Sequence, residues 1–197
     1  MLSMYENGYL ELIIGPMYSG KTSYLMNVFK QCLFCNTNVL VFNHDSDTRY
    51  DNDMLSTHDQ IKIPCIKTNS LSEYLQSDIY NNSEVILINE GQFFDDIFDF
   101  VLYSVDIKCK RVYVCGLDGD FKRNKFGKIN DLIPYCDNVN KLHSLCHMCK
   151  NGNKAIFSHR LTSEIEQQVI GSTNYVPLCR KCYLKENGNT LEMMANI

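Results

Sequence analysis

The fold of this chain is decided by the stretch Leu10-Glu11-Leu12-Ile13-Ile14-Gly15-Pro16-Met17-Tyr18-Ser19-Gly20-Lys21-Thr22. It starts with an apolar run of strand length and ends in the Walker A pattern Gly-x-x-x-x-Gly-Lys-Thr. Beyond it, apolar residues recur with helical spacing, as on one face of an amphipathic helix, at Leu25, Val28, Phe29 and Cys32. A strand, a glycine-rich turn and a helix in this order predict a phosphate-binding P-loop. We expect Lys21 to reach the β- and γ-phosphates of a nucleotide and the Thr22 hydroxyl to bind Mg²⁺.

Three further apolar runs predict the rest of a sheet. They lie at Val39 to Phe42, Val85 to Ile88 and Val112 to Cys115, and none alternates cleanly between apolar and polar residues. Continuous apolar strands are buried on both faces, as in a parallel sheet covered by helices. Parallel neighbours need long crossovers, and we expect helical ones over 71–80 and 93–105. The predicted fold class is therefore α/β, a P-loop parallel sheet with flanking helices.

Length and composition fit one domain with a small appendage. The chain has 197 residues, 45% of them hydrophobic, and its 19 Lys and Arg against 23 Asp and Glu give a net charge of −4. This balance argues against binding to nucleic acid, which favours a basic excess. The apolar runs fall far short of the roughly 20 residues that cross a bilayer, so we expect no membrane partner. The N-terminal residues lack a secretory leader, and we therefore expect a cytoplasmic protein with reduced thiols.

The cysteines predict a metal site near the C-terminus. Two Cys-x-x-Cys pairs, Cys146 with Cys149 and Cys179 with Cys182, are separated by the 29 residues 150–178. Four thiolates close a tetrahedral zinc site with no open position, so the zinc would be structural. His143 and His147 are nearby but are not needed as ligands. We expect the six other cysteines to be small buried hydrophobes, including Cys32 and Cys35 on the first helix.

The change in composition near residue 144 predicts the domain organisation. We expect a P-loop α/β domain over 1–143, a small C-terminal zinc-stapled loop domain over 144–186, and a disordered tail over 187–197. The small domain contains strand-like pieces at Ala155 to Ser158 and Gln168 to Ile170. Because it is too small to bury a core of its own, a metal would stabilise it.

A candidate catalytic group follows the strand Val85 to Ile88. The strand ends in Asn89-Glu90-Gly91-Gln92. A carboxylate that leaves an apolar strand beside a P-loop is a candidate general base or metal partner. We therefore expect Glu90 to act as a general base or as a partner of the metal ion.

Together these residues resemble the type II thymidine kinases, the zinc-containing class found in animals, bacteria and large DNA viruses. The stretch 15–22 is similar to the family's Gly-Pro-Met-Phe-Ser-Gly-Lys-Ser loop, and Glu90-Gly91-Gln92-Phe93-Phe94 to its catalytic strand end. The other matching stretches are Asp47-Thr48-Arg49-Tyr50 with Thr57-His58-Asp59, Leu117-Asp118-Gly119-Asp120-Phe121 through Phe126-Gly127, and the paired cysteines with Tyr175 between them.

The resemblance implies transfer of the γ-phosphoryl group of ATP to the 5'-hydroxyl of thymidine, with Glu90 as the base. It assigns contacts with ATP and its Mg²⁺ to the P-loop residues Gly15, Pro16, Met17, Tyr18, Ser19, Gly20, Lys21 and Thr22, and to Asp47, Thr48, Arg49, Asn89 and Gln92. It assigns contacts with thymidine to Met17, Phe93, Leu117, Phe121, Phe126, Gln167, Gln168, Val169, Ile170, Gly171 and Tyr175. It also implies a homotetramer and feedback inhibition by thymidine triphosphate.

One departure of the sequence from the family pattern affects the expected metal site. The family has Asp before the catalytic Glu, where it helps to hold hydrated Mg²⁺, and this chain has Asn89. An amide accepts a hydrogen bond from a metal-bound water but brings no negative charge, so the affinity for Mg²⁺ should fall. We expect Thr22 and ATP to retain the metal, with Asp45, Asp47 or Glu90 adding charge nearby.

Three alternatives to a thymidine kinase stay open at this point. The chain could be a broader pyrimidine deoxynucleoside kinase, because the pocket residues do not fix which 5-substituent is accepted. It could be a nucleotide-binding module with little or no turnover because of Asn89. The third alternative, a zinc-ribbon module that binds nucleic acid, is disfavoured by the acidic balance and the lack of a basic stripe.

Overall fold

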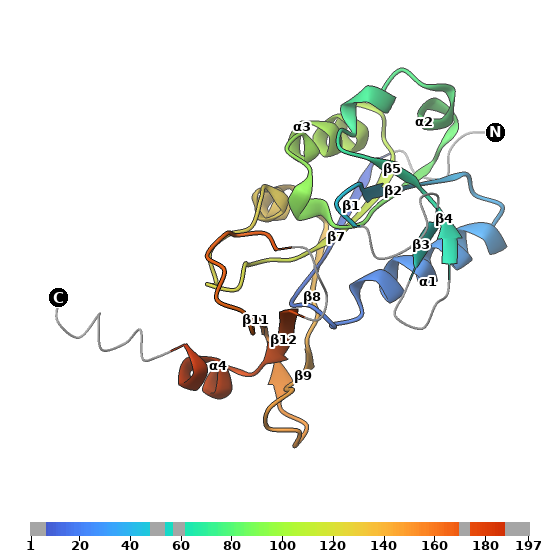
Figure 1. Cartoon of the computed structure of the whole chain (residues 1–197). Helices are drawn as coiled ribbons and strands as arrows, with labels where there is room; N and C mark the ends of the chain where they lie inside the picture. The colour runs from blue at the N-terminus through green and yellow to red at the C-terminus, as the bar shows by residue number, and fades with distance from the viewer. Residues whose placement is uncertain (1–6, 48–53, 57–61, 170–173, 188–197) are drawn as a thin grey trace.

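A six-stranded parallel sheet forms the centre of the molecule. The computed structural model describes residues 7–47, 54–56, 62–169 and 174–187 (Figure 1). The strand order is β5-β2-β6-β7-β1-β8, and every neighbouring pair runs parallel. The strands are β1 (Tyr9–Ile14), β2 (Val39–His44), β5 (Ile66–Thr68), β6 (Val85–Ile88), β7 (Arg111–Gly116) and β8 (Asn138–Lys141). The predicted α/β class and all four predicted strands are confirmed.

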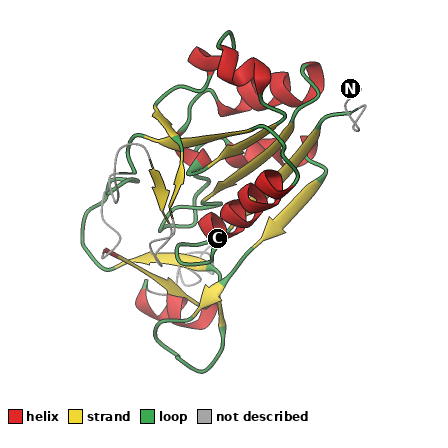
Figure 2. Ribbon diagram, turned by 90° about the vertical axis from the view of Figure 1, so that its right-hand side faces the viewer, coloured by secondary structure: helices red, strands yellow, loops and turns green. Residues whose placement is uncertain are grey.

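Helices cover both faces of this sheet. α1 (Lys21–Phe34) buries Leu25 and Phe29 in one apolar cluster with Ile13 of β1. Leu12 and Ile14 point to the opposite face, where they join a cluster with residues of α3 (Ile97–Leu102). Successive strand residues thus bury their side chains on opposite faces. Figure 2 shows the long α1 on one side of the strands and the shorter helices on the other.

The crossovers are less regular than predicted. The expected helix over 71–80 is instead a 3-10 turn, η1 (Ser72–Tyr74), followed by α2 (Asp78–Asn82). A new helix begins after Ser77, because the Ser77 hydroxyl accepts a hydrogen bond from the backbone N–H of Tyr80 and so caps α2. The helix expected over 93–105 begins only at Ile97, after the 3-10 turn η2 (Gly91–Phe93), and continues as a π-helical turn, η3 (Tyr103–Ile107).

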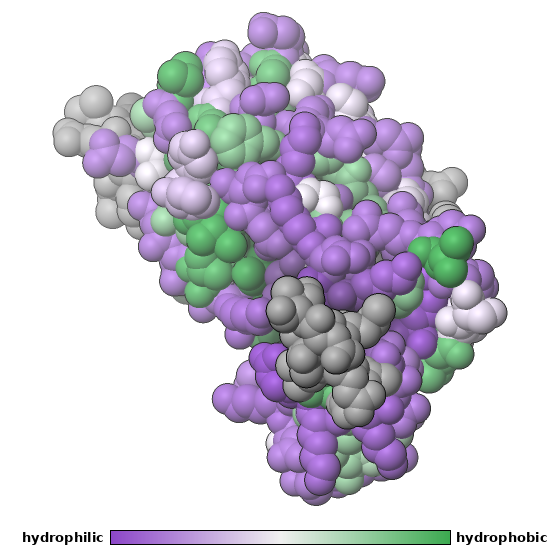
Figure 3. All heavy atoms as spheres, turned by 90° about the vertical axis from the view of Figure 1, so that its left-hand side faces the viewer, coloured by the Kyte–Doolittle hydropathy of each residue, from purple (hydrophilic) through white to green (hydrophobic). Residues whose placement is uncertain are grey.

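Smaller elements complete the fold around the sheet. β3 (Met54–Ser56) and β4 (Lys62–Pro64) pair antiparallel, and they bury Leu55 and Ile63 against α1. A 3-10 segment, η4 (Ile129–Tyr135), leads into β8. No helix in the described part of the chain is long and apolar enough to span a membrane. On the face shown in Figure 3, hydrophilic side chains predominate and hydrophobic ones form only small groups.

The residues after β8 form a separate small cluster of elements, at the bottom of Figure 1. Two antiparallel pairs and one helix surround the sulfur atoms of the paired cysteines. The elements are β9 (Ser144–Leu145), β10 (Lys154–Ala155), β11 (Phe157–Arg160), β12 (Tyr175–Leu178) and α4 (Arg180–Glu186). The strand expected at 155–158 is interrupted at Ile156, and Gln168 and Val169 are not in a strand.

The other six cysteines do not share one environment. Cys32 and Cys115 are buried, as expected, and Cys65 and Cys136 are partly exposed. The expectation was wrong for Cys35 and Cys109, which are exposed. Cys35 lies at the C-terminal cap of α1, and Cys109 lies between η3 and β7 with φ of 51°.

Candidate active site

The P-loop connects β1 to α1, as its sequence predicts. Gly15 has φ of 149°, and a side chain there would place Cβ 2.4 Å from the carbonyl oxygen of Leu142. Gly20, with φ of 85°, precedes the first turn of α1. The Lys21 ammonium donates a hydrogen bond of 2.7 Å to the carbonyl oxygen of Pro16. Because the first N–H groups of a helix lack acceptors within it, this loop can bind phosphate oxygens.

A chain of polar side chains runs from the partly exposed Thr22 of α1 across the buried ends of three strands. The Thr22 hydroxyl lies 3.5 Å from Oδ1 of Asn89, which also accepts a 3.0 Å hydrogen bond from the Cys115 thiol. Nδ2 of Asn89 donates to Oδ1 of Asn43 at 2.8 Å. Nδ2 of Asn43 donates to Oδ2 of Asp47 at 3.1 Å. The predicted residues Thr22, Asn89 and Asp47 are therefore joined through Asn43, which the sequence interpretation did not include.

The oxygen donors of this network are of the kind that Mg²⁺ prefers. The Thr22 hydroxyl and the Asn89 amide oxygen are neutral, and the Asp47 carboxylate lies one residue further along the network. Asp45, the other acid expected here, is exposed to solvent. These groups fit a magnesium ion that also binds a nucleotide, because Mg²⁺ in such sites usually retains water and phosphate ligands.

Glu90 is the second residue after β6 and has a strained backbone conformation. Its φ of 55° lies in the left-handed region, which few residues other than glycine adopt. Its Oε2 accepts a 2.7 Å hydrogen bond from the side-chain amide of Gln92. Gln92 is itself buried, and its Oε1 accepts from the backbone N–H of Leu117 at 2.9 Å. The Glu90 carboxylate is thus held in place through Gln92 by the end of β7.

Aromatic rings gather next to this carboxylate. Phe93 and Phe126 pack edge to face with their ring centres 5.4 Å apart. His44 packs against Phe94 and Phe93, at 4.8 Å and 5.5 Å between ring centres. Burial lowers the pKa of His44, although the nearby negative charges, including that of Glu90, act in the opposite direction. The structure therefore brings together two predicted thymidine contacts, Phe93 and Phe126, at the edge that carries Glu90.

One hydrogen bond joins the P-loop to the C-terminal elements. The backbone N–H of Met17 donates to the Ser158 hydroxyl of β11 at 3.0 Å. Ser158 is buried, and 141 positions separate it from Met17 in the sequence. This contact places β11 beside the residue that the sequence predicted to contact both substrates.

Several of the remaining predicted thymidine contacts are held by hydrogen bonds. The Gln167 amide donates to Oδ2 of Asp120 at 2.9 Å, and the Tyr175 hydroxyl donates to the carbonyl oxygen of Val169 at 3.4 Å. The carbonyl oxygen of Phe121 accepts a hydrogen bond from the Tyr183 hydroxyl. Gln168 is exposed. The predicted site residues Thr48, Arg49, Ile170 and Gly171 lie outside the described residues, as do Tyr50 and 57–59.

The four paired cysteines form the predicted metal centre. Their Sγ atoms all lie within 4.8 Å of one another, and those of Cys149 and Cys182 are 3.2 Å apart. Zinc bonds of 2.3 Å in a tetrahedron require sulfur atoms about 3.8 Å apart, so the set fits zinc. Burial raises the pKa of Cys146, but backbone N–H groups of Cys149, Cys179 and Met148 outweigh it and lower that pKa to about 6. The hydrogen bond with Cys149 raises the pKa of Cys182 to about 12.

The sequence interpretation omitted Ser158, Arg160 and Asn43 and gave Gln92 a different role. Ser158 and Arg160 occupy alternate, buried positions of β11, a strand too short to predict its orientation. Asn43 could have been found, because it ends an apolar strand at the same edge as Glu90. Gln92 was expected to contact the nucleotide, whereas its two side-chain groups bond to Glu90 and Leu117.

Comparison with known proteins gives one consistent result. Residues 8–183 match the family described as thymidine kinase. The chain is 42% identical over 182 residues to a thymidine kinase of rice, covering 90% of this chain and 66% of that protein. It is 40% identical over 183 residues to the thymidine kinase of Yaba monkey tumor virus, covering 92% of this chain and 98% of the relative. It is 37% identical over 184 residues to that of Bacteroides thetaiotaomicron, covering 93% and 90%.

Proposed function

Because the chain belongs to the thymidine kinase family, we propose that it transfers the γ-phosphoryl group of ATP to the 5'-hydroxyl of thymidine at the carboxyl edge of its sheet. One observation carries this assignment. Thr22 of the P-loop lies 3.5 Å from Asn89, and Asn89 directly precedes the carboxylate residue Glu90. A phosphate-binding loop and a candidate base thus meet at one edge, and phosphoryl transfer requires little more than such positioning.

In this reaction the P-loop holds the triphosphate and Lys21 neutralises its charge. Glu90 accepts the proton of the 5'-hydroxyl while that oxygen bonds to the γ-phosphorus, and the bond to the β–γ bridging oxygen breaks to release ADP. Gln92 holds the carboxylate toward the end of β7. Magnesium bound by Thr22, the Asn89 oxygen and ATP would neutralise charge on the transferred group.

The thymine base is proposed to lie among Met17, Phe93, Leu117, Phe126 and the segment that carries Gln167 and Val169. A flat pyrimidine is bound by apolar side chains and a small number of polar groups. The edge-to-face contact of Phe93 with Phe126 and the contact of Met17 with Ser158 support this placement. Zinc at the four cysteines would hold the elements that carry Ser158 and Tyr175 together.

The test is a steady-state assay of ADP and thymidine monophosphate formation with zinc-replete protein and graded Mg²⁺. Replacing Glu90 by Gln removes the proton acceptor, and kcat should fall by about 10²- to 10⁴-fold while thymidine still binds. Glu73→Gln is the matched control, since Glu73 is an exposed residue of η1. A Glu90→Gln variant with the parent's kcat would reject Glu90 as the base.

A second candidate function rests on the neutral side chain of Asn89. A nucleotide-binding module with weak or no turnover would bind thymidine and ATP but release little or no ADP at any Mg²⁺ concentration. The same assay separates the two functions, because only the kinase makes ADP in proportion to thymidine monophosphate. A broader pyrimidine deoxynucleoside kinase would phosphorylate deoxycytidine as well.

We propose four finer properties of this chain. The resemblance to the family supports a homotetramer and inhibition by thymidine triphosphate, which the mass of the assembly in solution and the steady-state rate with added thymidine triphosphate would test. We also propose a cytoplasmic location and a division into a P-loop domain and a zinc-stapled domain near residue 144.

A further inference from the structure

One buried arginine has every hydrogen-bond donor of its side chain engaged. Arg160 is the last residue of β11 and is 4% exposed. Its Nε and one N–H of Nη2 donate to the Tyr175 hydroxyl. The two N–H groups of Nη1 donate to the carbonyl oxygens of Glu164 and Glu166, and Nη2 donates to that of Gln167. A guanidinium has five N–H donors, and all five have partners here.

Three of these acceptors belong to one irregular segment. Residues 161–169 form no helix or strand, and most of their side chains are exposed. An irregular segment with so few buried apolar side chains has little to fix its path. The carbonyl oxygens of Glu164, Glu166 and Gln167 nevertheless converge on one side chain, at 2.9 Å, 2.5 Å and 3.0 Å. The backbone of the segment is therefore shaped around Arg160.

The same side chain connects this segment to residues on either side of it. The guanidinium carbon lies 3.7 Å from the ring centre of Phe121, a distance at which an arginine plane and an aromatic ring attract each other. The Tyr175 hydroxyl, which accepts from Arg160, donates to the carbonyl oxygen of Val169. Gln167 is fixed further by its bond to Asp120. Arg160 thus lies at the centre of contacts among Phe121, Tyr175, Gln167 and Val169.

We propose that Arg160 is a positioning residue for thymidine recognition: it does not touch the substrate, but it holds Gln167 to Val169 beside Phe121 in the form that binds the base. This inference rests on the proposed placement of the base beside this segment. It goes beyond that placement because it makes the Arg160 side chain responsible for the backbone conformation of residues 161–169. Binding of the base is tighter when its contacts are preorganised, since less ordering accompanies binding.

The proposal predicts that lysine cannot replace this arginine. Lysine keeps the positive charge and the apolar stem, but its three N–H donors are on one atom, and it has no planar group that can stack on the Phe121 ring. Arg160→Lys would lose at least two of the five hydrogen bonds that the guanidinium makes. The segment 161–169 should then exchange its backbone amide hydrogens faster, and thymidine should bind about tenfold or more weakly. ATP affinity and zinc content should stay at the parent's values.

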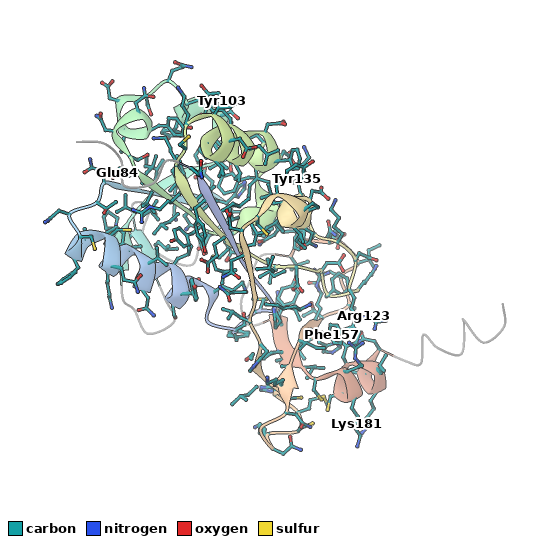
Figure 4. All side chains as sticks on the ribbon, turned by 180° about the vertical axis from the view of Figure 1, so that it is seen from behind. Glu84, Tyr103, Arg123, Tyr135, Phe157 and Lys181 are labelled. Atoms are coloured by element: carbon teal, nitrogen blue, oxygen red, sulfur yellow. The ribbon has the colours of Figure 1, made fainter. Side chains whose placement is uncertain are left out.

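Arg123→Lys is the matched control. Arg123 also lies near aromatic rings, 5.6 Å from the ring centre of Phe157 and 5.2 Å from that of Tyr183 (Figure 4). It is exposed and donates no hydrogen bond to the segment 161–169 among the contacts of the described residues. This variant should therefore leave both amide exchange over 161–169 and thymidine affinity unchanged.

The experiment combines hydrogen exchange of the zinc-replete full chain, read by mass spectrometry, with calorimetric titrations of thymidine and of ATP. Unchanged exchange over 161–169 in Arg160→Lys would overturn the proposal. Faster exchange with unchanged thymidine affinity would also overturn it, and would remove the segment from the proposed base pocket while leaving phosphoryl transfer at Glu90 intact. Failure of the proposed function has a different signature, a parent protein that makes no thymidine monophosphate.

A second variant keeps the test decisive if Arg160→Lys also loses zinc or ATP affinity. Arg160→Ala leaves room for a free guanidinium ion, and millimolar guanidinium chloride should restore thymidine affinity, whereas methylammonium should not. A lack of rescue in a variant that retains zinc and ATP binding would count against the proposal, because planar donors would then not be what the segment requires.

Discussion

The side-chain amide of Asn89 donates a 2.8 Å hydrogen bond to the side-chain oxygen of Asn43, and both residues are 1% exposed. The family has a carboxylate at the position of Asn89. In this chain the pair is neutral, and the nearest carboxylate in the network is Asp47, which accepts from Asn43. A carboxylate at position 89 would turn an oxygen toward Oδ1 of Asn43 instead of an N–H group.

We therefore predict two opposite effects of Asn89→Asp. The added charge beside Thr22 should lower the Mg²⁺ concentration that gives half-maximal rate. In the absence of Mg²⁺, the same buried charge should lower the free energy of unfolding by about 1–3 kcal/mol. The reason is that an aspartate at position 89 cannot donate the hydrogen bond that Asn89 donates to Asn43. Rates at graded Mg²⁺ and urea unfolding with a chelator measure the two effects.

Asn38→Asp is the control for this substitution. Asn38 is exposed at the start of β2, so the same chemical change should move neither quantity. If Asn89→Asp leaves the Mg²⁺ dependence of the rate unchanged, position 89 does not contribute to metal binding in this chain.

The contact between Gln92 and Glu90 gives a prediction about pH. Gln92→Glu would place a second carboxylate where an amide now donates at 2.7 Å. Like charges this close raise the pKa of at least one carboxyl group. The base would then stay protonated to a higher pH, so the acidic limb of the pH profile of kcat/KM should move to higher pH.

Gln92→Met separates charge from positioning in the same experiment. It removes both side-chain hydrogen bonds without adding a charge, and a displaced base should lower kcat by about 10- to 100-fold. The acidic limb should stay where it is in the parent. An equal movement of the limb in both variants would show that the pH effect of Gln92→Glu does not come from its charge.

The parts of this structure that the sequence predicted are those with local signals. The P-loop follows from four fixed positions in one short stretch, and β1, β2, β6 and β7 are largely apolar runs. The Cys-x-x-Cys spacing of the paired cysteines at 146 and 149 and at 179 and 182 predicted the metal site directly. Glu90 was found because it lies just beyond the end of an apolar strand.

The parts that were missed depend on contacts between distant residues. β8 pairs with β1 at the edge of the sheet, but its polar residues Asn138 to Lys141 give no apolar run. The bond from Met17 to Ser158 spans 141 positions. Arg160 acts on carbonyl groups, whose direction depends on the path of the backbone and not on residue type. Such residues become visible only once the chain is folded.

Removal of one zinc ligand should weaken thymidine binding more than ATP binding. In Cys179→Ser, zinc content should fall from about one ion per chain, because four thiolates form the site. The elements that hold Ser158 and Tyr175 would lose the metal that joins them, whereas the P-loop is part of the main sheet. Metal analysis and separate titrations of thymidine and ATP check this prediction.

Cys109→Ser serves as the control for a lost thiol, since Cys109 is exposed and outside the cluster. It should keep its zinc and both affinities. Zinc-free Cys179→Ser with the parent's affinity for thymidine would show that the metal centre does not support the base pocket.

His44 links stability to pH at the same edge of the sheet. Burial holds its pKa below the ordinary value of 6.5. The folded state therefore binds fewer protons than the unfolded state at pH values between the two pKa values. The contribution of neutral His44 is complete above about pH 6.5 and is lost as the pH falls toward the folded pKa. We expect the free energy of unfolding to decrease over that acidic window, and by less in His44→Asn, which unfolding at several pH values would measure.

The charge of Glu90 should affect the pKa of His44. The negative charges near His44, among them that of Glu90, raise its pKa against the larger effect of burial. Glu90→Gln removes one of these charges, so the pKa of His44 should fall further, as followed by the ring-proton shifts of His44 in an NMR titration. Glu73→Gln, in the exposed turn η1, should leave the pKa of His44 unchanged. An identical pKa of His44 in the parent and in Glu90→Gln would mean that the Glu90 carboxylate points away from this ring and toward solvent. In that case the hydrogen bond to Gln92 would not hold the carboxylate at the site of proton transfer.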